Sequence, residues 1–75
     1  MIIKILGSGC SKCQALTENT RKALADTGRE AEILKVTDFA GIAAHGVMST
    51  PALVVDGKVV SAGKVLTPAE IRAYL

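Results

Sequence analysis

The sequence of 75 residues is poor in aromatic residues, in clustered charge and in long apolar runs. Its aromatic residues are Phe39 and Tyr74, and it has no tryptophan, so a surface that stacks nucleobases is not expected. Nine basic and seven acidic residues give a net charge of +2, and Arg21-Lys22 is the one adjacent basic pair. We therefore expect neither nucleic acid nor a membrane surface as a partner.

The apolar run near the N-terminus, residues 2–6, is too short for a signal sequence or a membrane span. The expected location is then the cytoplasm, where paired cysteines are usually catalytic or metal-binding. A bridge between Cys10 and Cys13 would close too small a loop to stabilise the fold substantially. Stability must therefore come from an apolar core, for which 49% hydrophobic residues are enough in a single domain spanning residues 1–75.

Hydrophobic periodicity predicts an α/β chain with the element order βαβαββα. We expect strands at residues 2–6, 32–36, 52–55 and 58–62, and helices at residues 11–27, 39–45 and 68–75. The helical crossover makes the first two strands parallel, whereas the third must lie antiparallel to its neighbour in a mixed sheet. Asp56-Gly57 is expected to form a two-residue hairpin turn between the last two strands.

The three helices each have a predicted inward face and recognisable ends. On the first helix, three- and four-residue spacing places Cys13, Leu16, Thr20, Ala23, Leu24 and Thr27 on the inward face. Asp38 is expected to cap the second helix, whose inward residues would be Phe39, Ile42 and Ala43. The last helix begins with a capping box of Thr67 and Glu70, with Pro68 at its first position, and packs through Ile71 and through Leu75 or Tyr74.

The residues that carry chemistry form the cysteine motif, Gly7-Ser8-Gly9-Cys10-Ser11-Lys12-Cys13, where the first strand ends and the first helix begins. Unpaired N–H groups and the helix dipole favour the thiolate there, which is the nucleophilic and metal-binding form of cysteine. A C-x-x-C pair beside a βαβ pattern is typical of a thiol–disulfide site. We expect Cys10 to point outward and attack a substrate disulfide, and the more buried Cys13 to attack Cys10 and release the product.

A proline, Pro51, precedes the third strand, a position that a strand tolerates at its start or edge. The cysteine motif, the segment Gly46-Val47-x-Ser49-Thr50-Pro51, and Asp56-Gly57-Lys58 followed by Gly63 together resemble the thioredoxin/glutaredoxin superfamily. The resemblance covers the whole chain and is closest to the small thioredoxin-like redox-active disulfide proteins.

The resemblance implies a thioredoxin-like three-layer sandwich with a four-stranded mixed sheet in the order 2-1-3-4. The first and third helices would cover one face of the sheet and the second helix the other. The resemblance makes Cys10 the attacking and Cys13 the resolving cysteine of a thiol–disulfide oxidoreductase or electron carrier. It also implies that Pro51 is cis and packs against the cysteines, and that the Thr50 backbone binds an extended substrate segment. Substrate contacts are assigned to Gly9, Ser11, Lys12, Met48, Thr50, Pro51 and Gly63.

The chain departs from both branches of the superfamily in ways that leave its electron donor open. Gly9 stands where thioredoxins carry Trp, and residues 1–9 contain no acid. The segment 61–64 lacks the acid that glutaredoxins use to bind glutathione. We expect a monomer that acts on a disulfide-containing protein or small molecule and is reduced by a thiol or a reductase. An apolar rim near Val47, Met48 and Pro51 favours a protein or peptide. No cofactor is expected beyond the Cys10–Cys13 disulfide.

The main alternative is a soft-metal carrier, because two thiolates suit Cu(I) and the motif is also similar to that of heavy-metal-associated domains. A tetrahedral zinc site would need two more ligands, for which the sequence offers His45 and scattered acids. The capped last helix and Thr50-Pro51 argue against this alternative, so no metal site is assigned. A third interpretation is a binding module that keeps the fold without redox activity. Separately, the two cysteines are open to a purely structural interpretation as small apolar residues at a helix start.

Overall fold

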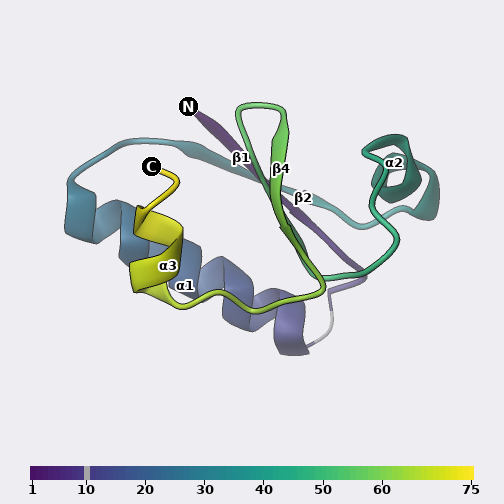
Figure 1. The fold of residues 1–75 in the computed structure, drawn as a ribbon, viewed down its shortest axis with the longest axis horizontal. Helices are drawn as coiled ribbons and strands as arrows, with labels where there is room; N and C mark the ends of the chain where they lie inside the picture. Colours follow the sequence, from purple (N-terminus) through teal and green to yellow (C-terminus); the bar gives the residue numbers. More distant parts are fainter. Residues whose placement is uncertain (10) are drawn as a thin grey trace.

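The computed structural model describes residues 1–9 and 11–75, so the predictions made for Cys10 lie outside the described residues. The elements are β1 Ile2–Leu6, α1 Ser11–Thr27, β2 Glu32–Val36, α2 Phe39–Ala44, β3 Ala52–Val55, β4 Lys58–Ala62 and α3 Pro68–Arg72 (Figure 1). The predicted strands and first helix are confirmed, whereas α2 and α3 end earlier than expected. In this described part, no helix is long and apolar enough to cross a membrane.

The four strands form one sheet in the order β2-β1-β3-β4, as predicted. β1 is parallel to β2 and antiparallel to β3, and β4 is antiparallel to β3. Because β1 and β2 run in the same direction, both end at one edge of the sheet, where the Gly7 N–H donates to the Val36 carbonyl at 3.0 Å. β3 begins at that same edge, since Ala52 pairs with Leu6. The cysteine motif and the Thr50-Pro51 segment therefore meet there.

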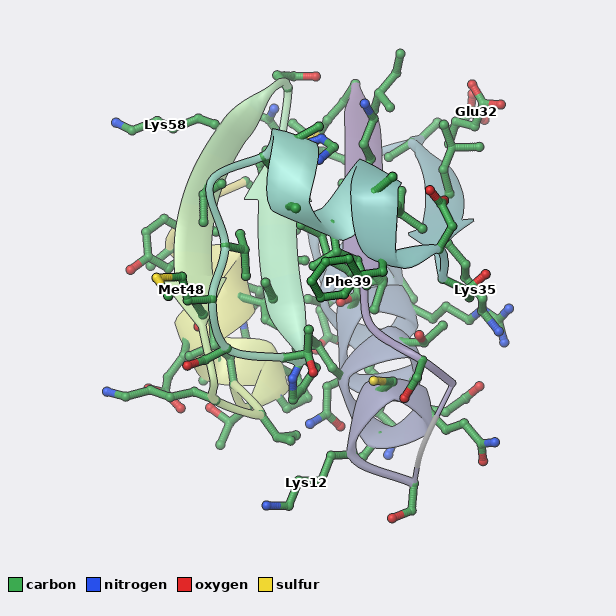
Figure 2. All side chains as sticks on the ribbon, turned by 90° about the vertical axis from the view of Figure 1, so that its right-hand side faces the viewer. Lys12, Glu32, Lys35, Phe39, Met48 and Lys58 are labelled. Carbon is green, nitrogen blue, oxygen red and sulfur yellow. The ribbon has the colours of Figure 1, made fainter. Side chains whose placement is uncertain are left out.

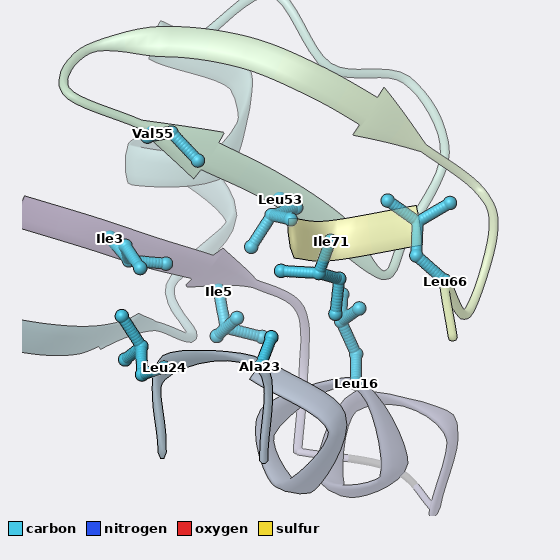
Figure 3. Close-up of a cluster of buried hydrophobic side chains, with 9 residues drawn as sticks. All are labelled: Ile3, Ile5, Leu16, Ala23, Leu24, Leu53, Val55, Leu66 and Ile71. Carbon is cyan, nitrogen blue, oxygen red and sulfur yellow. The ribbon is translucent and has the colours of Figure 1, made fainter. Parts of the chain in front are cut away.

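The core is divided into two layers by the sheet, and the predicted distribution of helices is confirmed. α1 and α3 pack together on one face (Figures 1 and 3). That layer contains Ile3, Ile5, Leu16, Ala23, Leu24, Leu53, Val55, Leu66 and Ile71. The smaller layer on the other face contains Leu6, Val47, Ala52 and Val54. Val36 of β2 and Ile42 of α2 pack against it.

The buried face of α1 differs from the prediction at two threonines. Thr17 is buried although it was not placed on the inward face, and Thr27 is exposed although it was. The Thr17 hydroxyl donates to the Cys13 carbonyl at 2.9 Å, so its polar atom is satisfied inside the helix and its methyl group can pack. Thr27 is the last residue of α1, where the helix has passed the end of the core.

Helix α2 is turned about its own axis relative to the prediction, so Phe39 and Ala43 were wrongly placed inward. Phe39 is 86% exposed and Ala43 is also exposed, while Ile42 is half-buried against the sheet. The side of α2 nearest the sheet is that of Gly41, where an added Cβ would lie 2.8 Å from Val36 Cγ1. Residues 39 and 43 lie two positions on either side of Gly41, roughly 200° around a helix of 3.6 residues per turn, and so face outward.

Helix α3 ends at Arg72 rather than Leu75. The next three N–H groups donate to carbonyls three residues back, from Ala73 to Glu70, from Tyr74 to Ile71 and from Leu75 to Arg72. Such bonds tighten the last turn of a helix and satisfy its terminal carbonyls. Of the two residues predicted as alternatives for packing this helix, Leu75 packs against the core, whereas Tyr74 is 48% exposed.

The predicted turn and caps are confirmed. Asp56 and Gly57 adopt φ values of 49° and 82°, the left-handed pair that a two-residue hairpin requires. Thr67 and Glu70 form the reciprocal capping box, with side-chain bonds of 3.2 and 3.1 Å. The Asp38 carboxylate caps α2 by accepting from the Gly41 N–H at 2.7 Å.

Candidate active site

The candidate active site is built where β1 passes into α1. Leu6 is the last residue of β1, and the hydrogen bond from Gly7 to Val36 holds the start of the connection against β2. Gly9 has a φ of 86°, which glycine adopts without strain, and α1 begins at Ser11. The chain thus reverses from strand to helix within a few residues, as the sequence predicts.

Cys13 lies in the first turn of α1 on the side that faces the sheet, and it is 5% exposed. The predicted burial of this cysteine is therefore confirmed. A Cβ added to Gly7 would overlap the Cys13 Sγ and would lie 3.7 Å from the Thr50 Cβ. Gly7 thus lies directly against the thiol, and Thr50 approaches the same point from the segment before β3.

The segment before β3 forms the other wall of the site. The Thr50–Pro51 peptide bond is cis, the Pro51 side chain is fully buried, and Thr50 is exposed. The Gly63 N–H donates to the Pro51 carbonyl at 2.9 Å, and a Cβ on Gly63 would lie only 3.0 Å from the Ser49 Cβ. Gly63 therefore permits a close backbone approach, and residues far apart in sequence converge at one edge of the sheet.

The remaining predicted contact residues lie at the rim. Ser11 and Lys12 are exposed, and the Lys12 side chain extends away from the protein (Figure 2). Met48 is 100% exposed, so it is a rim residue and not part of the core. Val47 and Pro51, near which the apolar rim is predicted, are themselves both buried.

A groove of about 740 Å³ opens beside the site, between α2 and the segment that leads to Pro51. We call it the α2 groove; its lining residues are Ser8, Thr37, Phe39, Ile42, Ala43, Gly46, Val47, Met48 and Thr50. In Figure 2 Phe39 lies at the middle of the view, with Met48 to its left. The sequence reading missed Phe39 as a surface residue, because periodicity in a six-residue helix does not distinguish its two faces.

A second, much smaller cavity of about 20 Å³ lies behind Cys13. Its walls include Ile5, Cys13, Thr17, Lys35 and Thr37. Lys35 and Thr37 had not been connected with the site from the sequence. The strand topology could have placed them there. They lie at the end of β2, and neighbouring parallel strands end at the same edge of a sheet.

The described residues offer no ready-made metal cage. Within residues 1–9 and 11–75, no three His, Cys, Asp or Glu side chains come close enough together to hold an ion. His45 is engaged instead with its own helix, its Nδ1 lying 2.8 Å from the Gly41 carbonyl. The soft-metal alternative would therefore depend on the two cysteines of the motif.

Comparison with known proteins gives a consistent result over the full chain. A family model described as "Thioredoxin domain" matches residues 1–75. A protein named thioredoxin from Methanocaldococcus jannaschii is 41% identical over 75 residues, which cover 100% of this chain and 86% of that protein. A thioredoxin from Methanothermobacter thermautotrophicus is 37% identical over 75 residues, which cover 100% of this chain and 97% of that protein.

Proposed function

Since this chain belongs to the thioredoxin domain family, we propose that it is a thiol–disulfide oxidoreductase or electron carrier that works through Cys10 and Cys13. The observation that carries the proposal is the position of Cys13. This cysteine is buried in the first turn of α1, against Gly7 and close to Thr50, in a sequence that has its other cysteine three residues earlier. We further propose that residues 1–75 act as one domain and as a monomer.

The proposed reaction consists of two exchange steps. The Cys10 thiolate attacks one sulfur of a substrate disulfide, forming a mixed disulfide and releasing the first substrate thiolate, which takes up a proton. The Cys13 thiolate then attacks the Cys10 sulfur and releases the second substrate thiolate, which is also protonated. The substrate gains two electrons and two protons, and the protein is left with a Cys10–Cys13 disulfide. A thiol or a reductase then returns it to the dithiol.

The other site residues are proposed to hold the substrate. Thr50 is exposed beside Gly7, which suits a backbone contact with an extended segment that carries the disulfide. Pro51 and Gly63 fix the position of that backbone through the bond from the Gly63 N–H to the Pro51 carbonyl. Gly9, Ser11 and Lys12 would contact the substrate on the side of α1, and Met48 on the side of α2.

Single-cysteine variants test this proposal. Cys10→Ser should abolish turnover of a protein disulfide, because the attacking thiolate is lost. Cys13→Ser should stop after the first step and accumulate a mixed disulfide that is seen by intact mass and released by dithiothreitol. The double variant is the control and should neither turn over nor accumulate the adduct. Turnover by Cys13→Ser at the wild-type rate would show that the two-cysteine mechanism is wrong.

A further inference from the structure

The α2 groove exposes two large apolar side chains at the edge of the candidate active site. Met48 is 100% exposed and Phe39 is 86% exposed, and they line the same groove as Ser8 and Thr50. Ser8 belongs to the cysteine motif, and Thr50 lies 3.7 Å from the position of a Cβ on Gly7. A concave apolar surface of this kind is typical of an interaction site. The groove is therefore continuous with the place where the disulfide would react.

Three lysines lie next to residues of the candidate active site, although no residue lining the α2 groove carries a formal charge. Lys12 directly precedes Cys13 in the first turn of α1, and Lys35 lines the small cavity behind Cys13. Lys64 follows Gly63, whose N–H is bonded to the Pro51 carbonyl. All three lysines are exposed.

The carboxylates lie elsewhere or are occupied. Glu18 pairs with Arg21 and Asp26 with Arg72, at 2.8 and 2.7 Å.

The remaining acids follow the same pattern. Glu70 belongs to the α3 capping box, and Asp56 accepts from the Ile2 N–H at the opposite end of β1. Glu30 and Glu32 lie at the start of β2, also at that far end. Asp38, the acid nearest the groove, has its carboxylate bound to the N-terminus of α2. The site end of the described molecule is therefore positive, and the uncharged apolar groove adjoins it.

We propose that the substrates are protein segments that place a large apolar side chain in the α2 groove and acidic residues beside the reactive disulfide. This inference rests on the proposed exchange function and specifies its substrate class. The acidic residues would be attracted by Lys12, Lys35 and Lys64, because complementary charge raises the rate of encounter. A small anionic disulfide would meet the same lysines but would leave the groove between Phe39 and Met48 unfilled.

Two peptides of equal length test the charge requirement. Each carries one cysteine in a mixed disulfide with 2-mercaptoethanol and a leucine two residues away, and the cysteine is flanked by aspartates in one peptide and by lysines in the other. We expect the reduced protein to react with the acidic peptide about tenfold faster at low ionic strength, with a preference that shrinks as salt is added. Equal rates for the two peptides would overturn the inference.

Charge-reversed variants show which lysines cause the preference for the acidic peptide. Lys35→Glu combined with Lys64→Glu should remove that preference or reverse it in favour of the basic peptide. Lys22→Glu combined with Lys58→Glu is the matched control and should retain the preference for the acidic peptide. It changes the net charge equally on exposed lysines away from the site, in the second half of α1 and at the start of β4. An equal loss in both double variants would mean that only the net charge matters and would contradict the proposed surface.

The groove is tested with Phe39→Ser and Met48→Ser. Each should slow the reaction of the acidic peptide severalfold, and the effect should disappear when the leucine of the peptide is replaced by serine. Tyr74→Ser, at an exposed aromatic residue on the last turn after α3, is the control. An unchanged rate in both groove variants would exclude the groove as the docking site.

A neutral small disulfide separates this inference from the proposed function. Bis(2-hydroxyethyl) disulfide has no charge and cannot fill the groove, so the two lysine double variants and Phe39→Ser should reduce it at the wild-type rate. Failure of the wild-type protein to reduce it would contradict the exchange function itself. If the wild-type protein reduces this disulfide normally but reacts with the acidic and basic peptides at equal rates, only the acidic-segment inference is contradicted.

Discussion

Gly7 is the residue that defines the space available to the Cys13 thiol. Its missing side chain leaves the position that the Cys13 Sγ occupies, and Thr50 borders the same space. The φ of Gly7 is not in the left-handed region, so the requirement for glycine here is one of space and not of backbone conformation. Any larger residue must displace the thiol or the segment before β3.

We predict that Gly7→Ala lowers the free energy of unfolding by about 1–3 kcal/mol, as overpacking of a core does. The displaced Cys13 should also slow the second exchange step by roughly tenfold or more. Chemical denaturation and quench-flow detection of the mixed disulfide measure the two effects. Gly28→Ala, at a positive φ with open space around it, is the control and should cost stability without slowing that step.

If Gly7→Ala resolves the mixed disulfide as fast as the wild type, Cys13 is not held by this contact. The space left by Gly7 would then not determine the position of the thiol.

Ser61 is a second residue whose effect can be predicted with a definite sign. Its Oγ is buried and has no hydrogen-bond partner among the described residues. Because a buried hydroxyl without a partner costs free energy, Ser61→Ala should raise the free energy of unfolding by about 1 kcal/mol. The urea midpoint measures this change, and the exposed Ser8→Ala variant should leave it unchanged. A lower midpoint for Ser61→Ala would indicate a partner for this hydroxyl.

Single side chains were the least predictable part of the molecule. Cys13 and Leu16 were placed correctly because they repeat at helical spacing over a long helix. Thr17 was missed because its burial depends on a hydrogen bond to the Cys13 carbonyl that hydropathy does not record. Lys35 was missed because its nearness to Cys13 arises from the pairing of β1 with β2 and not from the sequence around it.

At the scale of elements, α3 is a short helix whose start is fixed by its own side chains. Thr67 and Glu70 satisfy each other's backbone N–H groups, and Ile71 is fully buried against α1 and the sheet. We predict that Thr67→Ala costs about 1 kcal/mol of unfolding free energy, whereas Thr67→Ser retains the cap and most of the stability. Thermal or urea unfolding of the two variants measures the difference. Equal stability would mean that packing of Ile71 alone holds the helix.

The bounds of most elements follow from local chemistry, which is why the sequence predicted them. Asp56 and Gly57 set the hairpin because both adopt left-handed φ values, and Asp38 and Thr67 mark where helices begin. The rotation of α2 was not predictable in the same way. It depends on the close approach of Gly41 to Val36, a tertiary contact between two elements.

At the scale of the whole molecule, the strand order brings the cysteine motif, the Thr50-Pro51 segment and Gly63 to one edge of the sheet. The family resemblance predicted this order. From the residues alone, the crossover through α1 makes β1 and β2 parallel and the hairpin places β3 beside β4, but neither feature places β3 beside β1. The α2 groove could not be anticipated, since its walls depend on how α2 lies on the finished sheet. The cysteine site was thus recognisable from its motif, whereas the surface beside it required the structure.

A redox titration of the intact protein in thiol–disulfide buffers distinguishes thiol–disulfide exchange from metal binding at Cys10 and Cys13. Samples are alkylated at each potential, and the intact mass counts the thiols that remain. We expect Cys10 and Cys13 to be oxidised and reduced together, as one intramolecular two-electron couple. If both cysteines stay reduced across the whole range while copper or zinc co-purifies with the protein, the exchange function is contradicted and the soft-metal carrier takes its place.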